Sequence, residues 1–430
     1  MDIHSFIEGY AASDTVRAHM PGHKGHGGDI YRRDITEIHG ADSLYEANGI
    51  IAASEARASR IFGSLSTLYS CGGSTLCIQT MLALCVPQGD KVAAVRNCHR
   101  AFLSACIIGD YDVEWIYPEG GLIGGGISPA QAREVIERHH PVLLYVTSPD
   151  YAGNIAPIEE LAGICHEYGV ILAVDNAHGA YLRFVYEDGR PLHPLFRGAD
   201  ICCDSAHKTL PVLTGGAYLH INSPLEKYPG QAKMLMSTFG SSSPSYLILD
   251  SLDRCNGYME SLLQGDDYFD DLRRMKPVPR AFDTAGDECG KLAIVAPSGG
   301  YTGHELAQEL RERGIECEFA DDVYTVLMLT GLTKEELSHI SRAIDDIPPR
   351  TPFSADIPAV RPHRRVMSLR QAFFSEQELL PVTECAGRVC ARAVTVCPPG
   401  IAVTTGGEVF LPEDIPILVS QGITHAAVVK

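Results

Sequence analysis

Between residues 67 and 221 the chain alternates short apolar runs with longer segments whose apolar positions recur every three or four residues. The short runs are rich in β-branched residues, which is typical of strands buried inside a parallel sheet. The longer segments are typical of helices that cover such a sheet. The pattern therefore predicts an α/β fold with a doubly wound, mostly parallel sheet. The predicted strands are 67–71, 91–95, 113–117, 142–146, 170–174, 201–203 and 217–221, and the predicted helices are 51–62, 76–85, 129–139 and 159–168.

The pattern changes after a long helix that is predicted to begin near Tyr246. The segment Met275–Arg280 contains two prolines and is predicted to be a link, and residues 346–364 contain five prolines and are predicted to be irregular. Strands at 292–295 and 324–329 and helices at 304–313 and 334–344 predict a smaller α/β domain. The predicted division is an N-terminal arm at 1–48, a major domain at 49–255 and a C-terminal small domain at 256–430.

Composition and charge narrow the class of protein. A chain of 430 residues with 45% hydrophobic and 21% charged residues can bury a large core and is typical of a globular protein. Its 35 basic and 54 acidic residues give a net charge of −19, which argues against nucleic acid or an anionic membrane as a partner.

The sequence also predicts a cytoplasmic protein. It contains no apolar stretch long enough to span a membrane, and its first residues lack the basic start and apolar core of a signal peptide. The 14 cysteines include no Cys-x-x-Cys pair and fall mostly inside apolar runs, so we expect reduced, buried thiols and no metal site.

Candidate catalytic residues follow two of the predicted strands. Asp175-Asn176-Ala177-His178 comes after the run 170–174, and Ser205-Ala206-His207-Lys208 comes after the run 201–203. The carboxyl ends of parallel strands present side chains into one crevice, so the aspartate and the lysine are predicted to lie close together. This pair is what pyridoxal 5'-phosphate (PLP) requires: a lysine for the Schiff base and a carboxylate that keeps the pyridine nitrogen protonated. Each motif taken alone is common, and the first is equally typical of a helix N-cap.

A second candidate lies between the strand 67–71 and the helix 76–85. The turn Gly72-Gly73-Ser74-Thr75 would present backbone N–H groups and the positive end of a helix dipole to an anion such as phosphate. A simple N-cap has the same residues. No glycine-rich dinucleotide fingerprint follows the first strand and no Gly-Lys-Ser/Thr phosphate loop is present, which argues against a nicotinamide dehydrogenase and a P-loop enzyme.

Several spaced motifs occur together in the order found in one family. The chain resembles the fold-type I, PLP-dependent ornithine/lysine/arginine decarboxylases, and its short members in particular. This resemblance implies an aspartate aminotransferase-like large domain with a mostly parallel seven-stranded sheet, together with a smaller C-terminal α/β domain. The motifs are Arg17-Ala18-His19-Met20-Pro21-Gly22-His23-Lys24-Gly25, Arg96-Asn97-Cys98-His99, the Asp175 and Lys208 segments, and Pro398-Pro399-Gly400-Ile401.

The resemblance also implies roles for individual residues. Lys208 would form the internal aldimine, Asp175 would hold the pyridinium proton, and His99 would stack on the ring. His178 would reach the ring or its phenolic oxygen, and Lys208 or a nearby histidine would return a proton to the α-carbon. The residues implied to contact the phosphate are Gly73, Ser74, Thr75, Ser205 and His207.

Assembly is likewise implied by the resemblance. The loop Ser241-Ser242-Ser243 matches one that reaches the cofactor of the neighbouring subunit in relatives, so Ser242 is a further predicted cofactor contact. We therefore expect a homodimer or a dimer of dimers with active sites at the interface. The N-terminal arm would lie over the active-site entrance. Large relatives carry an additional N-terminal domain, so their high-order rings are not expected here.

Two departures affect the substrate and leave the cofactor residues intact. Cys397 stands where relatives commonly carry an aromatic residue, and Gly215 stands where many carry glutamine. Arginine is the first expected substrate, followed by lysine or ornithine, giving amines for polyamine biosynthesis, and no acidic residue is assigned to the distal cation. Two alternatives are another fold-type I reaction, such as transamination through an arginine that clamps the carboxylate, and a catalytically silent PLP-binding protein.

Overall fold

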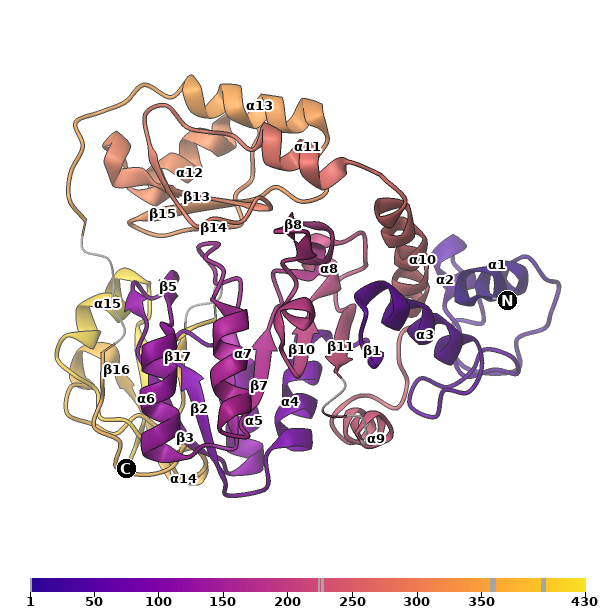
Figure 1. Cartoon of the computed structure of the whole chain (residues 1–430), viewed down its shortest axis with the longest axis horizontal. Coiled ribbons are helices and arrows are strands. Elements are labelled where there is room, and N and C mark those ends of the chain that lie inside the picture. The colour runs from indigo at the N-terminus through magenta and orange to yellow at the C-terminus, as the bar shows by residue number, and fades with distance from the viewer. Residues whose placement is uncertain (1, 223–224, 226–227, 356–360, 396–399) are drawn as a thin grey trace. The chain divides into compact units, whose positions relative to one another are not determined.

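The computed structural model of the chain describes residues 2–222, 225, 228–355, 361–395 and 400–430. Its central sheet has seven strands in the order β1-β11-β10-β7-β6-β2-β3 (Figure 1). Strand β11 runs antiparallel to both β1 and β10, whereas β10 is parallel to β7 and β2 is parallel to β3 and β6. The strands are β1 (Ser66–Ser70), β2 (Lys91–Val95), β3 (Asp112–Ile116), β6 (Leu143–Thr147), β7 (Ile171–Asp175), β10 (Ile201–Asp204) and β11 (Ala217–Ile221).

These strands confirm the predicted α/β class and the mostly parallel sheet. Each predicted strand lies within one or two residues of an observed one, because β-branched runs that are buried on both faces differ clearly from amphipathic helices. The smaller C-terminal α/β region is also present. The predicted domain boundaries at residues 48 and 255 stay a prediction. By its internal contacts the chain forms two compact units, one of residues 1–85 and 171–268 and one of residues 86–170 and 269–430.

The first unit contains β1, β7, β10 and β11 together with the helices that follow them. Helix α3 (Ile50–Phe62) ends at Gly63, whose left-handed backbone (φ 62°) closes it. Helix α4 (Gly73–Cys85) is buried on nearly all sides and packs against β10 and β11. The other elements are α1 (Ile3–Ala11), α2 (Asp29–Arg33), the 3-10 helices η1 (Ala180–Phe184) and η2 (Pro194–Arg197), α8 (Ala206–Thr209), α9 (Pro229–Phe239), α10 (Tyr246–Leu263), and β8 (Tyr186–Glu187) paired with β9 (Arg190–Pro191).

The second unit contains β2, β3 and β6 and the C-terminal part of the chain from residue 269. A four-stranded antiparallel sheet is formed by β12 (Asp283–Ala285), β13 (Lys291–Val295), β15 (Tyr324–Met328) and β14 (Phe319–Ala320). Its helices are α5 (Arg100–Gly109), α6 (Pro129–His139), α7 (Ile158–Glu167), α11 (Tyr268–Met275), α12 (Gly303–Glu312), α13 (Lys334–Asp345), α14 (Leu369–Phe374) and α15 (Asp414–Ser420), and its short 3-10 helices are η4 (Ala296–Gly299) and η5 (Val382–Glu384). The remaining strands form three ribbons: β4 (Glu119–Gly120) with β5 (Gly125–Gly126), β16 (Gln377–Pro381) with β19 (His425–Val429), and β17 (Val394–Thr395) with β18 (Ala402–Thr404).

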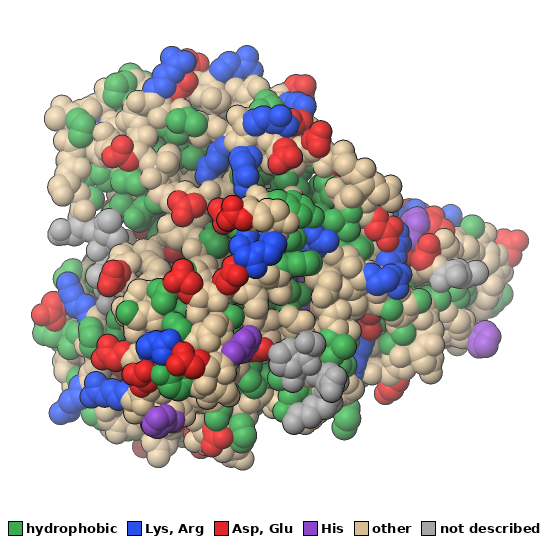
Figure 2. All heavy atoms as spheres, viewed as in Figure 1, with side chains coloured by type: hydrophobic (Ala, Val, Ile, Leu, Met, Phe, Trp, Pro, Cys, Tyr) green, Lys and Arg blue, Asp and Glu red, His purple; other side chains and the backbone are tan. Residues whose placement is uncertain are grey.

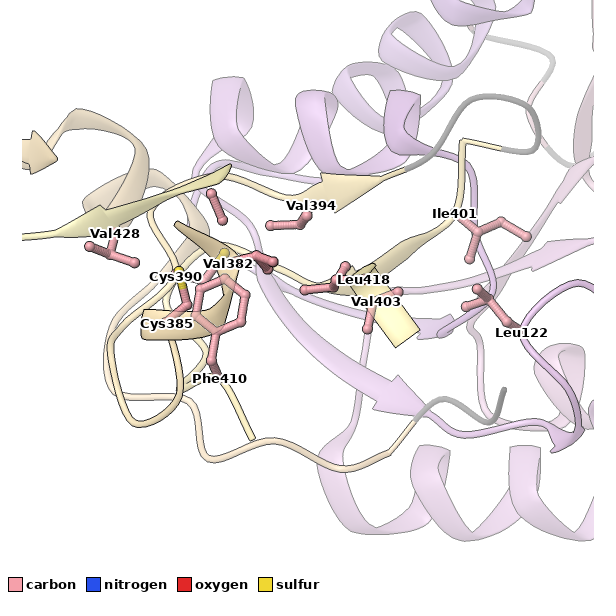
Figure 3. Packing of buried hydrophobic residues seen from close by; sticks show 11 residues of the cluster. Leu122, Val382, Cys385, Cys390, Val394, Ile401, Val403, Phe410, Leu418 and Val428 are labelled. Atoms are coloured by element: carbon pink, nitrogen blue, oxygen red, sulfur yellow. The ribbon is translucent and has the colours of Figure 1, made fainter. Parts of the chain in front are cut away.

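The C-terminal segment from residue 361 has an apolar core of its own (Figure 3). Phe410 and Leu418 are buried there, and Leu122 joins them from the region after β3. Burial of this apolar surface, at about 25 cal/mol per Å², is the main force that holds the segment against the rest of its unit. The other members of the cluster are Val382, Cys385, Cys390, Val394, Ile401, Val403, Ala426 and Val428.

A buried arginine ties this segment to the end of β2. Arg96 is fully buried and donates hydrogen bonds to the carbonyl oxygens of Ala402 (2.8 Å) and Val403 (3.2 Å). It also pairs with the buried carboxylate of Glu408, at 3.1 Å from Nη2 to Oε2. Because a buried charge requires such partners, this arginine fixes the C-terminal segment at the strand that leads to His99.

The surface and the thiols are as the composition suggests. Acidic and basic side chains are interspersed on the face shown in Figure 2. None of the described helices is both long and apolar enough to cross a membrane. No cysteine within the described residues forms a disulfide, and burial raises the pKa of several of them, including Cys77 and Cys85, to about 12.

Candidate functional site

The ends of β7 and β10 lie side by side and carry the two residues singled out by the sequence. The strands pair in parallel with Cys203 opposite Asp175, and the N–H of Asn176 donates to the carbonyl of Cys203 at 2.9 Å. Lys208 lies on α8, the single turn of helix that follows β10. The parallel register therefore brings the aspartate and the lysine segments to the same edge of the sheet, as predicted.

Asp175 is buried, and its carboxylate is held by its neighbours. The N–H of Ala177 donates to Oδ1 at 3.2 Å, and the thiol of Cys203 approaches the same oxygen at 3.7 Å. These contacts fix the carboxylate at the strand end. The thiol contact was not predicted, although the parallel register of two adjacent strands would have indicated it.

Lys208 is exposed and lies next to a buried histidine. Its Nζ is 2.9 Å from Nε2 of His178, which follows β7 by three residues. A lysine amine that is both accessible and hydrogen-bonded to an imidazole is suited to attack a carbonyl carbon and to exchange protons. The sequence predicted both residues as site residues, but it did not predict that they contact each other.

The start of α4 forms the turn predicted to hold a phosphate. Gly73 has a left-handed backbone (φ 66°), and a Cβ built on it would meet no atom within 4 Å, so the space above this turn is open. Its N–H is already donated to the carbonyl of Gly215 at 2.8 Å. Backbone donors to an anion at the helix start would therefore come from the residues that follow it, Ser74 and Thr75. The Ser205 hydroxyl donates to the Ser74 hydroxyl at 2.8 Å, so the turn and the lysine segment lie together.

His207 is oriented by the backbone of the following loop. Its Nδ1 donates to the carbonyl of Gly216 at 3.0 Å, and its own N–H donates to the same oxygen at 3.2 Å. Burial lowers the pKa of His207, which favours the neutral imidazole. The glycine at position 215, where many relatives carry glutamine, has a local structural reason. Its φ is 97°, a conformation that glycine adopts without strain.

His99 belongs to the second unit. Its Nδ1 accepts the N–H of Ala101 at 3.2 Å and so caps α5, and its backbone bridges to Ile401. A Cβ on Gly400 would lie 2.7 Å from the imidazole Cδ2, so only glycine at this position leaves room for the ring. The C-terminal segment therefore determines where this imidazole lies. The other residue that differs from the family pattern, Cys397, lies outside the described residues. The same holds for Pro398 and Pro399.

The serine loop borders a pocket of the first unit. Ser242 is exposed between Ser241 and Ser243, and the pocket, of about 430 Å³, is lined by both of these serines and by Gly72 and Thr75 of the phosphate turn. The structure thus places the loop beside this turn in the same chain. Its predicted contact with the cofactor of a neighbouring subunit stays a prediction.

One buried polar cluster escaped sequence reasoning. Asp204, the last residue of β10, accepts hydrogen bonds at Oδ2 from Nε2 of both His193 and His220, each at 3.0 Å. Within the described residues, these three side chains also have ligand atoms close enough to hold a metal ion, all within 4.8 Å of one another. In the sequence, His193 and His220 each lie within an apolar stretch. This pattern does not indicate that the two histidines meet at Asp204.

Comparisons with known proteins show the family of this chain and agree with its fold. The family profile described as Orn/Lys/Arg decarboxylase, major domain, matches residues 8–298, and the corresponding C-terminal domain profile matches residues 357–419. The chain therefore belongs to the Orn/Lys/Arg decarboxylase family and is an amino-acid decarboxylase. Proteins named arginine decarboxylase from Halalkalibacterium halodurans and Bacillus anthracis are 27% and 29% identical to it, over 96% and 94% of this chain and 91% and 90% of their own.

A solved structure shows the same fold at lower identity. Lysine decarboxylase A from Pseudomonas aeruginosa superposes with a TM-score of 0.79 at 19% identity, over 97% of this chain and 75% of that one. At this identity the likeness supports the fold, and the substrate has to be argued from the site.

Proposed function

We propose that the chain is a PLP-dependent decarboxylase that converts a basic amino acid, with arginine first and lysine or ornithine next, to the corresponding amine and carbon dioxide. The observation that carries this proposal is the exposed Lys208 amine, which lies 2.9 Å from His178. Lys208 follows β10, the strand that pairs with β7, and β7 ends in Asp175. The family and the near full-length likeness to arginine decarboxylases support the reaction and the order of substrates. The net charge of −19 is compatible with a cationic substrate.

The residues present fit PLP. The open turn at Gly73 can admit a phosphate, and the hydroxyls of Ser74 and Ser205, 2.8 Å apart, are suitable donors to it. Thr75 and His207 complete the proposed phosphate contacts. When bound, PLP supplies an electron sink for the negative charge that remains on the α-carbon after carbon dioxide leaves.

Asp175 and Lys208 have distinct tasks in this proposal. The Asp175 carboxylate is buried and fixed at the strand end, so it can retain a proton on the pyridine nitrogen without moving. Lys208 would be the residue that holds the cofactor, through Nζ.

The histidines would orient groups and move protons. His178 Nε2 accepts from Nζ of Lys208, so it keeps this amine oriented and can take up or return a proton there. Lys208 or His178 would then protonate the α-carbon. His99 is proposed to stack on the ring, and Gly400 leaves the space that its imidazole occupies.

The first test maps the covalent attachment. The purified protein, loaded with PLP and reduced with borohydride, should carry the reduced cofactor on the peptide that contains Lys208. Lys208→Ala should abolish both this adduct and amine production, whereas Lys334→Ala, which replaces a lysine of α13, should change neither. A covalent adduct that persists in Lys208→Ala would overturn the assignment. Comparing amine release from arginine, lysine and ornithine then ranks the substrates.

A further inference from the structure

Both carboxylate oxygens of Asp204 accept hydrogen bonds from other buried side chains. Its two oxygens accept from three side chains: Oδ2 from His193 and His220 at 3.0 Å each, and Oδ1 from Nδ2 of Asn176 at 2.6 Å. Asp204 and both imidazoles are fully buried. A carboxylate with three donors and no access to water is a rigid, ionised anchor.

The outer nitrogens of the two histidines show where their protons lie. The N–H of Leu195 donates to Nδ1 of His193 at 3.4 Å, and the Thr67 hydroxyl lies 2.8 Å from Nδ1 of His220. A ring nitrogen that accepts a hydrogen bond carries no proton, so Nε2 of His193 carries the proton and donates it to Asp204. A metal bound at that Nε2 would instead require a proton on Nδ1, facing the Leu195 N–H. The contacts therefore favour a hydrogen-bond network over a metal site.

The electrostatics agree with an ionised carboxylate at the centre of the cluster. Burial lowers the pKa of His220, which favours its neutral imidazole. Burial alone would raise the pKa of Asp204, but the two imidazoles and their hydrogen bonds outweigh it and hold this pKa well below its usual range. The Asp204 carboxylate is therefore ionised at neutral pH.

The anchor joins the two segments that carry the proposed cofactor residues. Asn176 follows Asp175 directly, and Asp204 is followed by Ser205 and lies four residues before Lys208. The amide oxygen of Asn176 is buried with no hydrogen-bond partner among the described residues. Its orientation is therefore set by its donation to Asp204.

We infer that Asp204, gripped by His193 and His220, is a positioning residue that locks the ends of β7 and β10 together so that Asp175 and Lys208 face the same bound cofactor. This inference rests on the proposed function. It gives the two histidines a task that does not require them to touch the cofactor, and it explains why the strand before the lysine ends in a buried charge.

The chain offers a matched control at the opposite end of the same strand pair. Asp200 is also buried, precedes β10, and accepts the N–H of Leu172 at 2.8 Å, so it joins the starts of β7 and β10. Asp200→Asn and Asp204→Asn make the same chemical change in the same two-stranded frame. Only Asp204→Asn changes the end that presents the site.

The experiment compares these variants by cofactor binding as well as by stability. We expect both to lower the thermal unfolding midpoint of the cofactor-free protein. Only Asp204→Asn should weaken PLP binding, by about tenfold or more in an absorbance titration, and shift the pH midpoint of the bound cofactor's visible absorbance downward, because a negative charge near Lys208 is lost. Asn176→Ala, which keeps both histidine donors, should weaken PLP binding in the same direction and serves if Asp204→Asn does not fold.

Three results would overturn the inference. One is unchanged PLP binding and absorbance in Asp204→Asn or, if that variant does not fold, in Asn176→Ala. Another is an equal effect of Asp200→Asn. The third is a stoichiometric metal in the purified protein that is lost in Asp204→Asn. A wild-type chain that binds no PLP would instead overturn the proposed function, and the inference with it.

Discussion

At the scale of single residues, Asp175 gives the most direct test of the proposed electron sink. Asp175→Asn keeps the size of the side chain but removes the charge that would hold a proton on the pyridine nitrogen. We expect PLP still to bind and the turnover number to fall by about a thousandfold or more. Steady-state kinetics together with a PLP titration separate the two effects.

Asp253→Asn is the appropriate comparison for this substitution. Asp253 is another buried aspartate of the first unit and lies on α10. It accepts a hydrogen bond from the Ser54 hydroxyl at 2.5 Å. It should lower stability and leave the turnover number of the folded enzyme nearly unchanged. Near-normal turnover in Asp175→Asn would remove Asp175 from its proposed role.

The sequence predicted the positions of the candidate residues better than the contacts between them. Asp175, His178 and Lys208 lie at or just after strand ends as expected, because each follows a recognisable apolar run within a few residues, which is local information. Their roles stay a prediction. Contacts between these residues depend on which strands become neighbours. Examples are the hydrogen bond between His178 and Lys208 and the hydrogen bonds from His193 and His220 to Asp204. Strand order is a long-range property, so these contacts became visible only in the folded chain.

At the scale of elements, the turn that carries Gly400 tests how the C-terminal segment places His99. Gly400 and Gly387 both have a left-handed backbone, with φ of 75° and 80°. An alanine at either position would introduce similar backbone strain, of about 1–2 kcal/mol. At position 400 the added methyl would also meet the His99 ring at 2.7 Å, whereas at 387 it would meet no atom within 4 Å.

We therefore expect Gly400→Ala to reduce catalytic turnover and stability together, and Gly387→Ala to reduce stability alone. Thermal unfolding and kinetics of both variants make the comparison. Equal turnover in the two variants would show that the His99 ring does not depend on this turn.

A histidine of the same segment predicts a pH dependence of stability. The His363 side chain is buried, with Nε2 2.8 Å from Asp414 and Nδ1 3.9 Å from Glu408. Burial alone would lower its pKa, but the hydrogen bond to Asp414 and the charges of Glu408 and Asp414 outweigh this and raise it above its usual value. A raised pKa in the folded state contributes stability that is fully present below the unfolded pKa and is lost as pH rises through the folded pKa.

We therefore expect the protein to lose stability as the pH rises, because His363 loses its proton. The thermal unfolding midpoint should fall as the pH rises above the ordinary histidine pKa of about 6.5, and it should fall more steeply in the wild-type protein than in His363→Gln. Parallel curves for the two proteins would show that this pair contributes nothing to the attachment of the segment.

The elements themselves were predicted with uneven success. Strands and amphipathic helices such as α6 and α13 lie close to their predicted ranges. The strands are short, continuous apolar runs, whereas these helices carry apolar positions every three or four residues among polar ones. Helix α5 was not predicted, since residues 100–109 are apolar on most sides and carry no clear period. The attachment of the C-terminal segment through Arg96 was also missed, because its partner Glu408 lies 312 residues away in the chain.

At the scale of the whole molecule, the proposed homodimer follows from the family resemblance and from the exposed serine loop. If the loop with Ser242 completes the neighbouring active site, the active species must contain at least two chains. Light scattering coupled to size-exclusion chromatography should give twice the chain mass of 46.6 kDa, or a multiple of that dimer. A monomer with full activity would contradict this.

The central claim concerns which bond at the substrate α-carbon is broken. The bond held perpendicular to the cofactor ring is cleaved, so a decarboxylase must turn the carboxylate out of the ring plane, into surroundings that do not stabilise its charge. A transaminase instead keeps the carboxylate in the plane, usually through an arginine. The two geometries lead to different products from the same cofactor and the same amino acid.

The decisive measurement is therefore a product balance on the PLP-loaded enzyme, with arginine, lysine or ornithine, in the presence and absence of 2-oxoglutarate. The account predicts one carbon dioxide and one amine for each amino acid consumed, with PLP retained and no dependence on the keto acid. Accumulation of pyridoxamine phosphate that 2-oxoglutarate converts back to PLP, without release of carbon dioxide, would contradict it.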